Sequence, residues 1–121
     1  MSLNTSSFLR VGKIWDIAKN PDQFEWKRLR DGMSIHSLYK TDAGPSAALI
    51  RIDPGVTIPK HFHTGYEHII VLEGFLSDKY GNQNPGDLLV NQPGTSHEVF
   101  TETGAIVLGI WEKPIQFEVH V

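Results

Sequence analysis

The sequence predicts an all-β protein that folds as a single sandwich or barrel domain. Short runs of alternating apolar and polar residues recur along the chain, and turns rich in Gly, Pro, Asn and Asp separate them. Only residues 14–20 have a helical pattern. The chain has 121 residues, a length that favours one domain with one core. We therefore expect residues 1–121 to form one domain.

The first elements are a short helix and two strands. The helix over residues 14–20 should end at Asn20–Pro21, because a residue before proline is biased away from helical backbone. Residues 24–31 follow, with Phe24 and Trp26 alternating with polar side chains as in a half-buried strand. Residues 33–40 continue this pattern.

The later strands lie between turns where glycine allows positive φ and a neighbouring proline fixes φ. These turns contain Gly44, Gly55, Gly74, Gly86 and Gly94. The segment 55–74 reads as strand apart from a bend at Thr64–Gly65. The other expected strands are residues 47–53, 66–74, 75–82, 87–91, 96–101, 105–111 and 115–121.

Composition excludes several classes of function. The formal net charge is −3, so no basic face is available for nucleic acid. The absence of cysteine excludes disulfides, thiolate catalysis and cysteine-based zinc sites, and it fits the cytoplasm. The apolar runs are too short to span a membrane, and residues 1–10 lack the apolar core of a signal peptide. We expect a cytoplasmic protein with no membrane partner.

The stretch "GVTIPKHFHTGYEHIIVLEG", residues 55–74, concentrates imidazoles and carboxylates in a strand-like run. His61 and His63 point to the same face because side chains alternate along a strand, and Glu67 has the same parity. Phe62 points to the other face and is expected in the core. His97 follows the turn Pro93–Gly94, and it joins the cluster if its strand pairs near His61 and His63.

Such a cluster suits a divalent metal. Neutral imidazole is a ligand for Zn, Cu, Fe and Ni, and a carboxylate favours harder ions. Without a metal, several titratable groups buried together cost free energy unless they are paired. The alternative is a metal-free, hydrogen-bonded cluster.

The spacing Gly55-x5-His61-x-His63-x3-Glu67-x6-Gly74 resembles the first motif of the cupin family at every fixed position. The second cupin motif is matched at Gly86, Gly94 and His97, whereas Gln92 stands where proline is usual and Thr101 where asparagine is usual. We expect these departures to affect the turn and the strand end but not the ligand.

The phrases "VLEG", "SD..G" and "PG..H" resemble the ChrR-type cupin subgroup over residues 25–113. This resemblance implies a jelly-roll barrel, the double-stranded β-helix, with His61, His63, Glu67 and His97 as ligands of one divalent metal ion per chain. Fe²⁺ is the ion expected in function, and Zn²⁺, Mn²⁺ and Ni²⁺ suit the same ligands.

The resemblance leaves three functions open. The first is a non-haem iron dioxygenase, in which the four ligands act through the metal to cleave a C–C bond in a small β-diketone or hydroxyacetophenone. The second is a metal-binding sensor without turnover, similar to the cupin domain of ChrR-type anti-sigma factors. The third is a cupin isomerase or epimerase. Ile69, Val71 and Trp111 are candidates for the wall of the substrate site.

Other residues are expected to lie outside the site. They include His36, His68, His120, Glu73 and the hairpin tip "SDKYGN". Trp15, Trp26 and Trp111 read as core or interface anchors, which for Trp111 is the alternative to a place in the wall. Because an open edge strand such as residues 115–121 is an aggregation hazard, we expect a two-fold homodimer.

Overall fold

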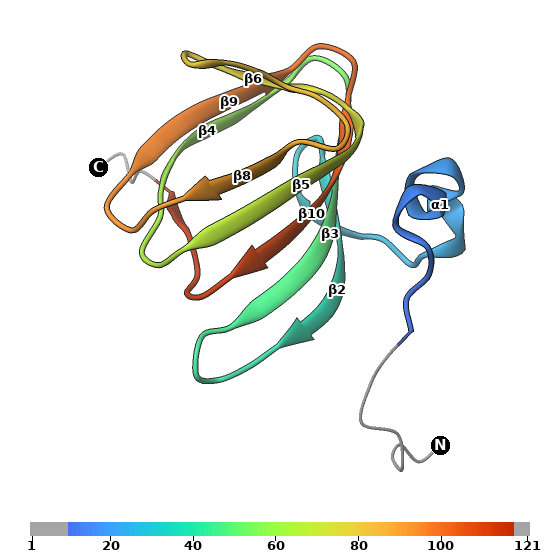
Figure 1. Ribbon diagram of the computed structural model, residues 1–121, viewed down its shortest axis with the longest axis horizontal. Helices are drawn as coiled ribbons and strands as arrows, with labels where there is room; N and C mark the ends of the chain where they lie inside the picture. Colours follow the sequence, from blue (N-terminus) through green and yellow to red (C-terminus); the bar gives the residue numbers. More distant parts are fainter. Residues whose placement is uncertain (1–9, 118–121) are drawn as a thin grey trace.

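The computed structural model describes residues 10–117, which form two facing antiparallel sheets with one short helix on the outside (Figure 1). The elements are the helix α1 (Ile14–Lys19), a 3₁₀ turn (Pro21–Gln23) and eleven strands. The strands are β1 (Lys27–Arg30), β2 (Met33–Lys40), β3 (Ser46–Ile52), β4 (Val56–Phe62), β5 (Glu67–Gly74), β6 (Leu76–Asp78), β7 (Gly81–Gln83), β8 (Leu88–Asn91), β9 (Ser96–Thr101), β10 (Ala105–Trp111) and β11 (Gln116–Phe117).

The chain changes sheets at most of its connections, as a jelly roll does. One sheet has the order β1-β2-β3-β10-β5-β8, and the other has the order β11-β4-β9-β6-β7. Strands that follow one another from β3 to β6 therefore lie alternately in the two layers. The predicted all-β jelly roll is confirmed.

The core fills the space between the sheets. Inward positions of the larger sheet carry branched aliphatic side chains, and they meet Ile58 and Val99 of the smaller sheet. Val71 and Val107 are almost completely buried at the centre. Side chains on one face of β5 and β10 therefore line the interior of the barrel, as the alternation of side chains along a strand predicts.

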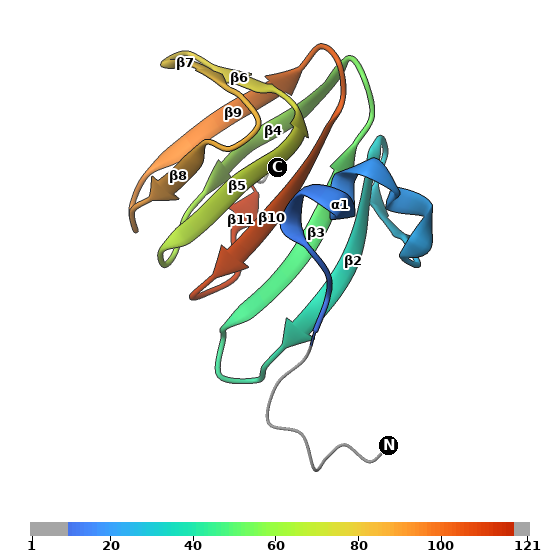
Figure 2. The same ribbon diagram turned by 45° about the vertical axis from the view of Figure 1, so that its right-hand side comes forward.

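A second apolar cluster lies on the outer face of the larger sheet. Ile17 and Ala18 of α1 pack on Leu49, Leu72 and Ile106, and Figure 2 shows the helix lying across this face. The strand β3 is covered on both faces, which explains why "AALI" is continuously apolar rather than alternating.

Among the glycines of residues 10–117, Gly74 makes the closest approach to a neighbouring backbone segment. Gly74 ends β5 with φ +70°, and a Cβ there would lie only 1.9 Å from the carbonyl oxygen of Gly104. No other residue fits this position without moving the chain. The last glycine of the first motif is therefore required by both conformation and space.

Four expectations need correction. The strand predicted over 24–31 is only Lys27–Arg30, because Trp26 packs in the outer cluster and its indole donates a hydrogen bond to the carbonyl of Pro21. The run 75–82 is a hairpin of β6 and β7.

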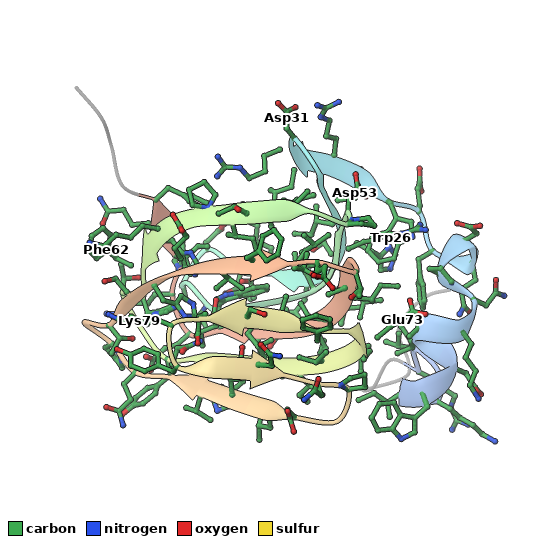
Figure 3. All side chains as sticks on the ribbon, turned by 90° about the horizontal axis from the view of Figure 1, so that it is seen from above. Trp26, Asp31, Asp53, Phe62, Glu73 and Lys79 are labelled. Atoms are coloured by element: carbon green, nitrogen blue, oxygen red, sulfur yellow. The ribbon has the colours of Figure 1, made fainter. Side chains whose placement is uncertain are left out.

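The run 55–74 is also two strands. His61 lies on β4, while Glu67 begins β5 in the opposite sheet. Phe62 is 37% exposed and lies at the periphery in Figure 3, not in the core, because the outer face of β4 is open to solvent. Of the strand expected over 115–121, only Gln116–Phe117 falls within the described residues, and His120 lies outside them.

Candidate metal centre

Four side chains from three segments of the barrel converge at one point. His61 comes from β4 and His63 from the residue just beyond it, Glu67 begins β5, and His97 lies on β9. The pairing of β4 with β9 places His61 directly opposite His97, which meets the condition under which His97 joins the cluster. The bend after His63 brings Glu67 across from the other sheet.

The cluster is compact and shielded. One potential ligand atom from each of the four residues lies within 4.8 Å of the other three. Two ligand atoms on opposite sides of one ion stand about 4.2 Å apart when each bond is about 2.1 Å. Inward movement of a few tenths of an ångström by each atom would therefore bring even the most distant pair to that separation. His61, His63 and Glu67 are buried.

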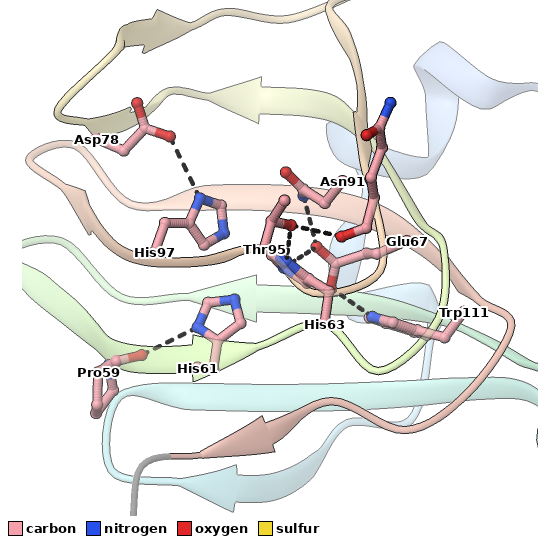
Figure 4. A network of polar contacts seen from close by, with 10 residues as sticks. Pro59, His61, His63, Glu67, Asp78, Asn91, Thr95, His97 and Trp111 are labelled. Atoms are coloured by element: carbon pink, nitrogen blue, oxygen red, sulfur yellow. Dashed lines mark hydrogen bonds and ion pairs between the residues drawn. The ribbon is translucent and has the colours of Figure 1, made fainter.

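Each imidazole is held through Nδ1 by a hydrogen-bond acceptor (Figure 4). The Nδ1 of His61 lies 3.0 Å from the carbonyl oxygen of Pro59, and the Nδ1 of His97 lies 3.3 Å from a carboxylate oxygen of Asp78. Since a carbonyl and a carboxylate can only accept, both Nδ1 atoms carry the proton. In the neutral rings, Nε2 then has the free lone pair that a metal needs.

His63 reaches the same state through a hydroxyl. Thr95 Oγ1 lies 2.6 Å from the carbonyl of Gln92, so its single proton is donated there. The hydroxyl must then accept from His63 Nδ1, 2.9 Å away. The Nε2 atom of His63 is buried with no hydrogen-bond partner, although Glu67 Oε1 lies 3.2 Å away. A buried nitrogen whose lone pair has no hydrogen-bond donor nearby fits the role of a metal ligand.

Two donors hold the carboxylate of Glu67. Asn91 Nδ2 donates to Oε1 at 2.8 Å, and Trp111 Nε1 donates to Oε2 at 2.5 Å. Such outer hydrogen bonds orient metal ligands and tune their basicity.

The electrostatics keep the ligands ready to bind. Burial lowers the pKa of His61 below its ordinary value of 6.5, so this imidazole is neutral at pH 7. Burial opposes ionisation of Glu67, but its contacts with His63, Trp111 and Asn91 outweigh that effect and lower its pKa below 4.5. Metal ligands must be deprotonated, and these two already are.

A cavity of about 350 Å³ opens beside the cluster. His61, Glu67 and His97 form part of its wall, while His63 lies behind them. The remainder is mostly aliphatic, including Ile50, Ile69, Leu89, Val99 and Val107, with Trp111 next to Glu67. A volume of this size accommodates a small molecule.

Sequence reasoning missed the residues that hold the ligands. Asp78 sits in "SDKYGN", which was expected to need no functional explanation, yet its nearly buried carboxylate contacts His97. Asn91 and Thr95 were not singled out. Trp111 was expected to be a wall residue, and it is both a wall residue and a donor to Glu67. The pairings of β6 with β9, of β8 with β5 and of β10 with β5 create the contacts of Asp78, Asn91 and Trp111, so no local signal in the sequence announces them.

Two of the histidines that were expected to lie outside the site, His36 and His68, do lie away from the cluster. His36 packs between Phe24 and Trp26 and contacts the carbonyl of Glu25, and His68 takes the outward position that its parity predicts.

Within residues 10–117, no helix is long and apolar enough to cross a bilayer.

Comparison with known proteins supports the fold and identifies a family. The sequence model of the family described as the ChrR Cupin-like domain matches residues 15–112. A curated relative, the anti-sigma-E factor ChrR of Cereibacter sphaeroides, is 25% identical over 103 residues, which are 84% of this chain and 48% of that protein. The chain thus spans about half the length of this relative.

Solved structures share the fold. A complex of SigE with the anti-sigma ChrR from Rhodobacter sphaeroides matches with a TM-score of 0.69 and 25% identity, over 78% of this chain and 53% of that one. An acetylacetone dioxygenase from Acinetobacter johnsonii matches with a TM-score of 0.74 over 98% of this chain and 82% of that one. At 11% identity, the latter likeness concerns the fold alone.

Proposed function

Since this chain belongs to the ChrR Cupin-like domain family, we propose that it is a metal-dependent dioxygenase that cleaves a C–C bond in a small, largely apolar substrate with two neighbouring oxygen functions. One observation carries the proposal. Three imidazoles with free Nε2 atoms and one ionised carboxylate converge where an apolar cavity begins.

His61, His63, Glu67 and His97 would hold one divalent ion, with Fe²⁺ expected in function. An iron ion bound there would supply the Lewis acidity and redox chemistry for reaction with O₂. Three neutral ligands and one anion leave a net positive centre, which favours a substrate bound as its enolate. The cluster offers four ligand atoms, so an ion of higher coordination number keeps positions for substrate and O₂.

The cavity favours an apolar body for the substrate. Its inner wall is aliphatic, and among residues 10–117 the one lysine or arginine in its lining is the exposed Lys40. A phosphorylated or dicarboxylic substrate would therefore find no lysine or arginine inside the cavity to pair with a charge that lies away from the metal, and burying that charge would be costly. A β-diketone or a hydroxyacetophenone fits this chemistry: it presents two oxygens at one end and hydrocarbon at the other.

The test is oxygen uptake by protein reconstituted with Fe²⁺ under anaerobic conditions. Acetylacetone and 2-hydroxyacetophenone are offered separately, and the products are analysed for two carbonyl fragments that together contain both atoms of O₂. His61→Ala should abolish uptake. His68→Ala is the matched control, because its side chain faces away from the cluster, and it should retain uptake. Absence of uptake with both substrates from fully metallated protein would contradict the proposal.

The second candidate is a metal-binding sensor without turnover. The 25% identity to the anti-sigma-E factor ChrR over 103 residues favours it. This function predicts stoichiometric metal binding with no oxygen uptake, together with a protein partner that binds differently to the metal-free and metal-loaded forms. The oxygen measurement above separates the two candidates.

A further inference from the structure

The strand β10 carries two inward positions that work as a unit beside Glu67. Ala105, Val107, Gly109 and Trp111 share the face that lines the barrel, since side chains alternate along a strand. In the pairing of β10 with β5, Trp111 lies opposite Glu67 and Gly109 lies opposite Ile69. The indole is thus next to the carboxylate by register.

Gly109 is not required by its backbone conformation. It is a buried strand residue and is not among the glycines with positive φ. A Cβ at this position would instead lie 2.3 Å from Cη2 and 2.5 Å from Cζ2 of the Trp111 ring. Atoms this close overlap. The indole of Trp111 therefore occupies the volume that a side chain at position 109 would need.

This orientation of the indole delivers its single donor to Glu67. Nε1 of Trp111 lies 2.5 Å from Oε2, while Asn91 occupies Oε1. Because the indole nitrogen donates only and cannot rotate independently of its ring, a small displacement of the ring breaks the hydrogen bond. Glu67 is 4% exposed, so water is a poor substitute for the lost donor.

We infer that Gly109 and Trp111 form a positioning pair for Glu67, in which Gly109 seats the indole and the indole N–H fixes the carboxylate that binds the metal. The inference rests on the proposed metal centre and adds Gly109, a residue that has no polar side chain, to the residues that support it. It also predicts a direction of action: Gly109 acts on the metal only through Trp111.

The test measures the affinity of metal-free protein for Co²⁺ alone, followed by the visible absorption of the bound ion. Trp111→Phe keeps an aromatic wall but removes the N–H, and Gly109→Ala keeps the N–H but displaces the ring. Each should weaken Co²⁺ binding by about 10–100-fold, the usual effect of losing a residue that orients a ligand. Trp26→Phe is the matched control, because its indole also donates a hydrogen bond, to Pro21, away from the cluster.

The double variant Gly109→Ala/Trp111→Phe separates positioning from general damage to the fold. If Gly109 acts through Trp111, the double variant binds Co²⁺ as weakly as Trp111→Phe alone. Additive losses, or unchanged affinity in both single variants, would overturn the inference while leaving the metal centre intact. Thermal unfolding of each metal-free variant identifies losses that come from misfolding. If the unsubstituted protein binds no Co²⁺, the inference and the proposed function fail together.

Discussion

Replacing Thr95 by Val should separate metal affinity from stability. Valine keeps the shape of threonine but lacks the hydroxyl that accepts from His63 Nδ1 at 2.9 Å. A shielded N–H left without an acceptor costs about 1–3 kcal/mol. The imidazole can avoid this cost by moving its proton to Nε2, where Glu67 Oε1 lies 3.2 Å away. In that tautomer Nε2, the nitrogen that would bind the metal, has no free lone pair.

The expected result is a loss of about 10–100-fold in metal affinity, or about 1.4–2.8 kcal/mol, with a smaller change in the free energy of unfolding of the metal-free protein. Competition titration with Zn²⁺ and a chelator measures the first quantity, and urea denaturation measures the second. Nitrogen-15 chemical shifts of the histidines identify the tautomer.

Thr101→Val is the matched control for this experiment. Thr101 is also a threonine whose hydroxyl donates to a carbonyl, that of Phe75 at 2.7 Å, but it is 1% exposed and lies four residues beyond His97 on β9. It should show the opposite pattern, with lower stability and unchanged metal affinity. Equal metal affinity in Thr95→Val and the unsubstituted protein, or a proton on Nε2 of His63 in the unsubstituted metal-free protein, would refute the reasoning.

Three further predictions concern stability and assembly. Leu49→Ala should lower the free energy of unfolding by about 2–5 kcal/mol, because the side chain is completely buried beneath α1, whereas Leu88→Ala, at 58% exposed, should change it by about 0.5 kcal/mol or less in the same urea titration. The metal-free protein should lose stability as the pH falls below about 6.5, because the pKa of His61 is lowered and the unfolded chain therefore binds a proton that the folded chain resists. The lowered pKa of Glu67 acts in the same direction below about 4.5, and a free energy of unfolding that stayed constant through this range would contradict both assignments. We also expect a two-fold dimer, so light scattering at micromolar concentration should give twice the 13.6 kDa of one chain, and the mass of a single chain would show the expectation to be wrong.

Local pattern was sufficient for most strands. The expected bounds 33–40, 96–101 and 105–111 agree with β2, β9 and β10, because alternation and flanking turns mark both ends of each. The convergence of His61 with His97 could also be anticipated, since it needs only one strand pairing.

What alternation cannot supply is which face of a strand is covered. It correctly places Phe62 opposite His61, but whether that opposite face meets the core or solvent depends on the layers of the whole barrel. In the same way, the helix α1 covers the outer face of β3, whereas the outer face of β4 is exposed to solvent. The pattern of apolar residues within either strand does not predict this difference.

The residues that hold the ligands were hidden for a similar reason. Asp78 and Asn91 are ordinary turn and strand-end residues by composition, and they acquire a role only when β6 lies beside β9 and β8 beside β5. Gly109 was not singled out from the sequence, because only the position of the Trp111 ring shows why a side chain does not fit there.

Whether His61, His63, Glu67 and His97 bind a metal ion is decided by the metal stoichiometry of the chain. Metal-free protein is loaded with Fe²⁺ under anaerobic conditions, desalted, and analysed by mass spectrometry of the elements, beside His63→Ala, His97→Ala and the outward-facing control His68→Ala. We expect one ion per chain in the unsubstituted protein and in His68→Ala, and a large loss of metal in the other two variants while their folds persist. Full occupancy in His63→Ala and His97→Ala would show that the four converging side chains are not the metal site.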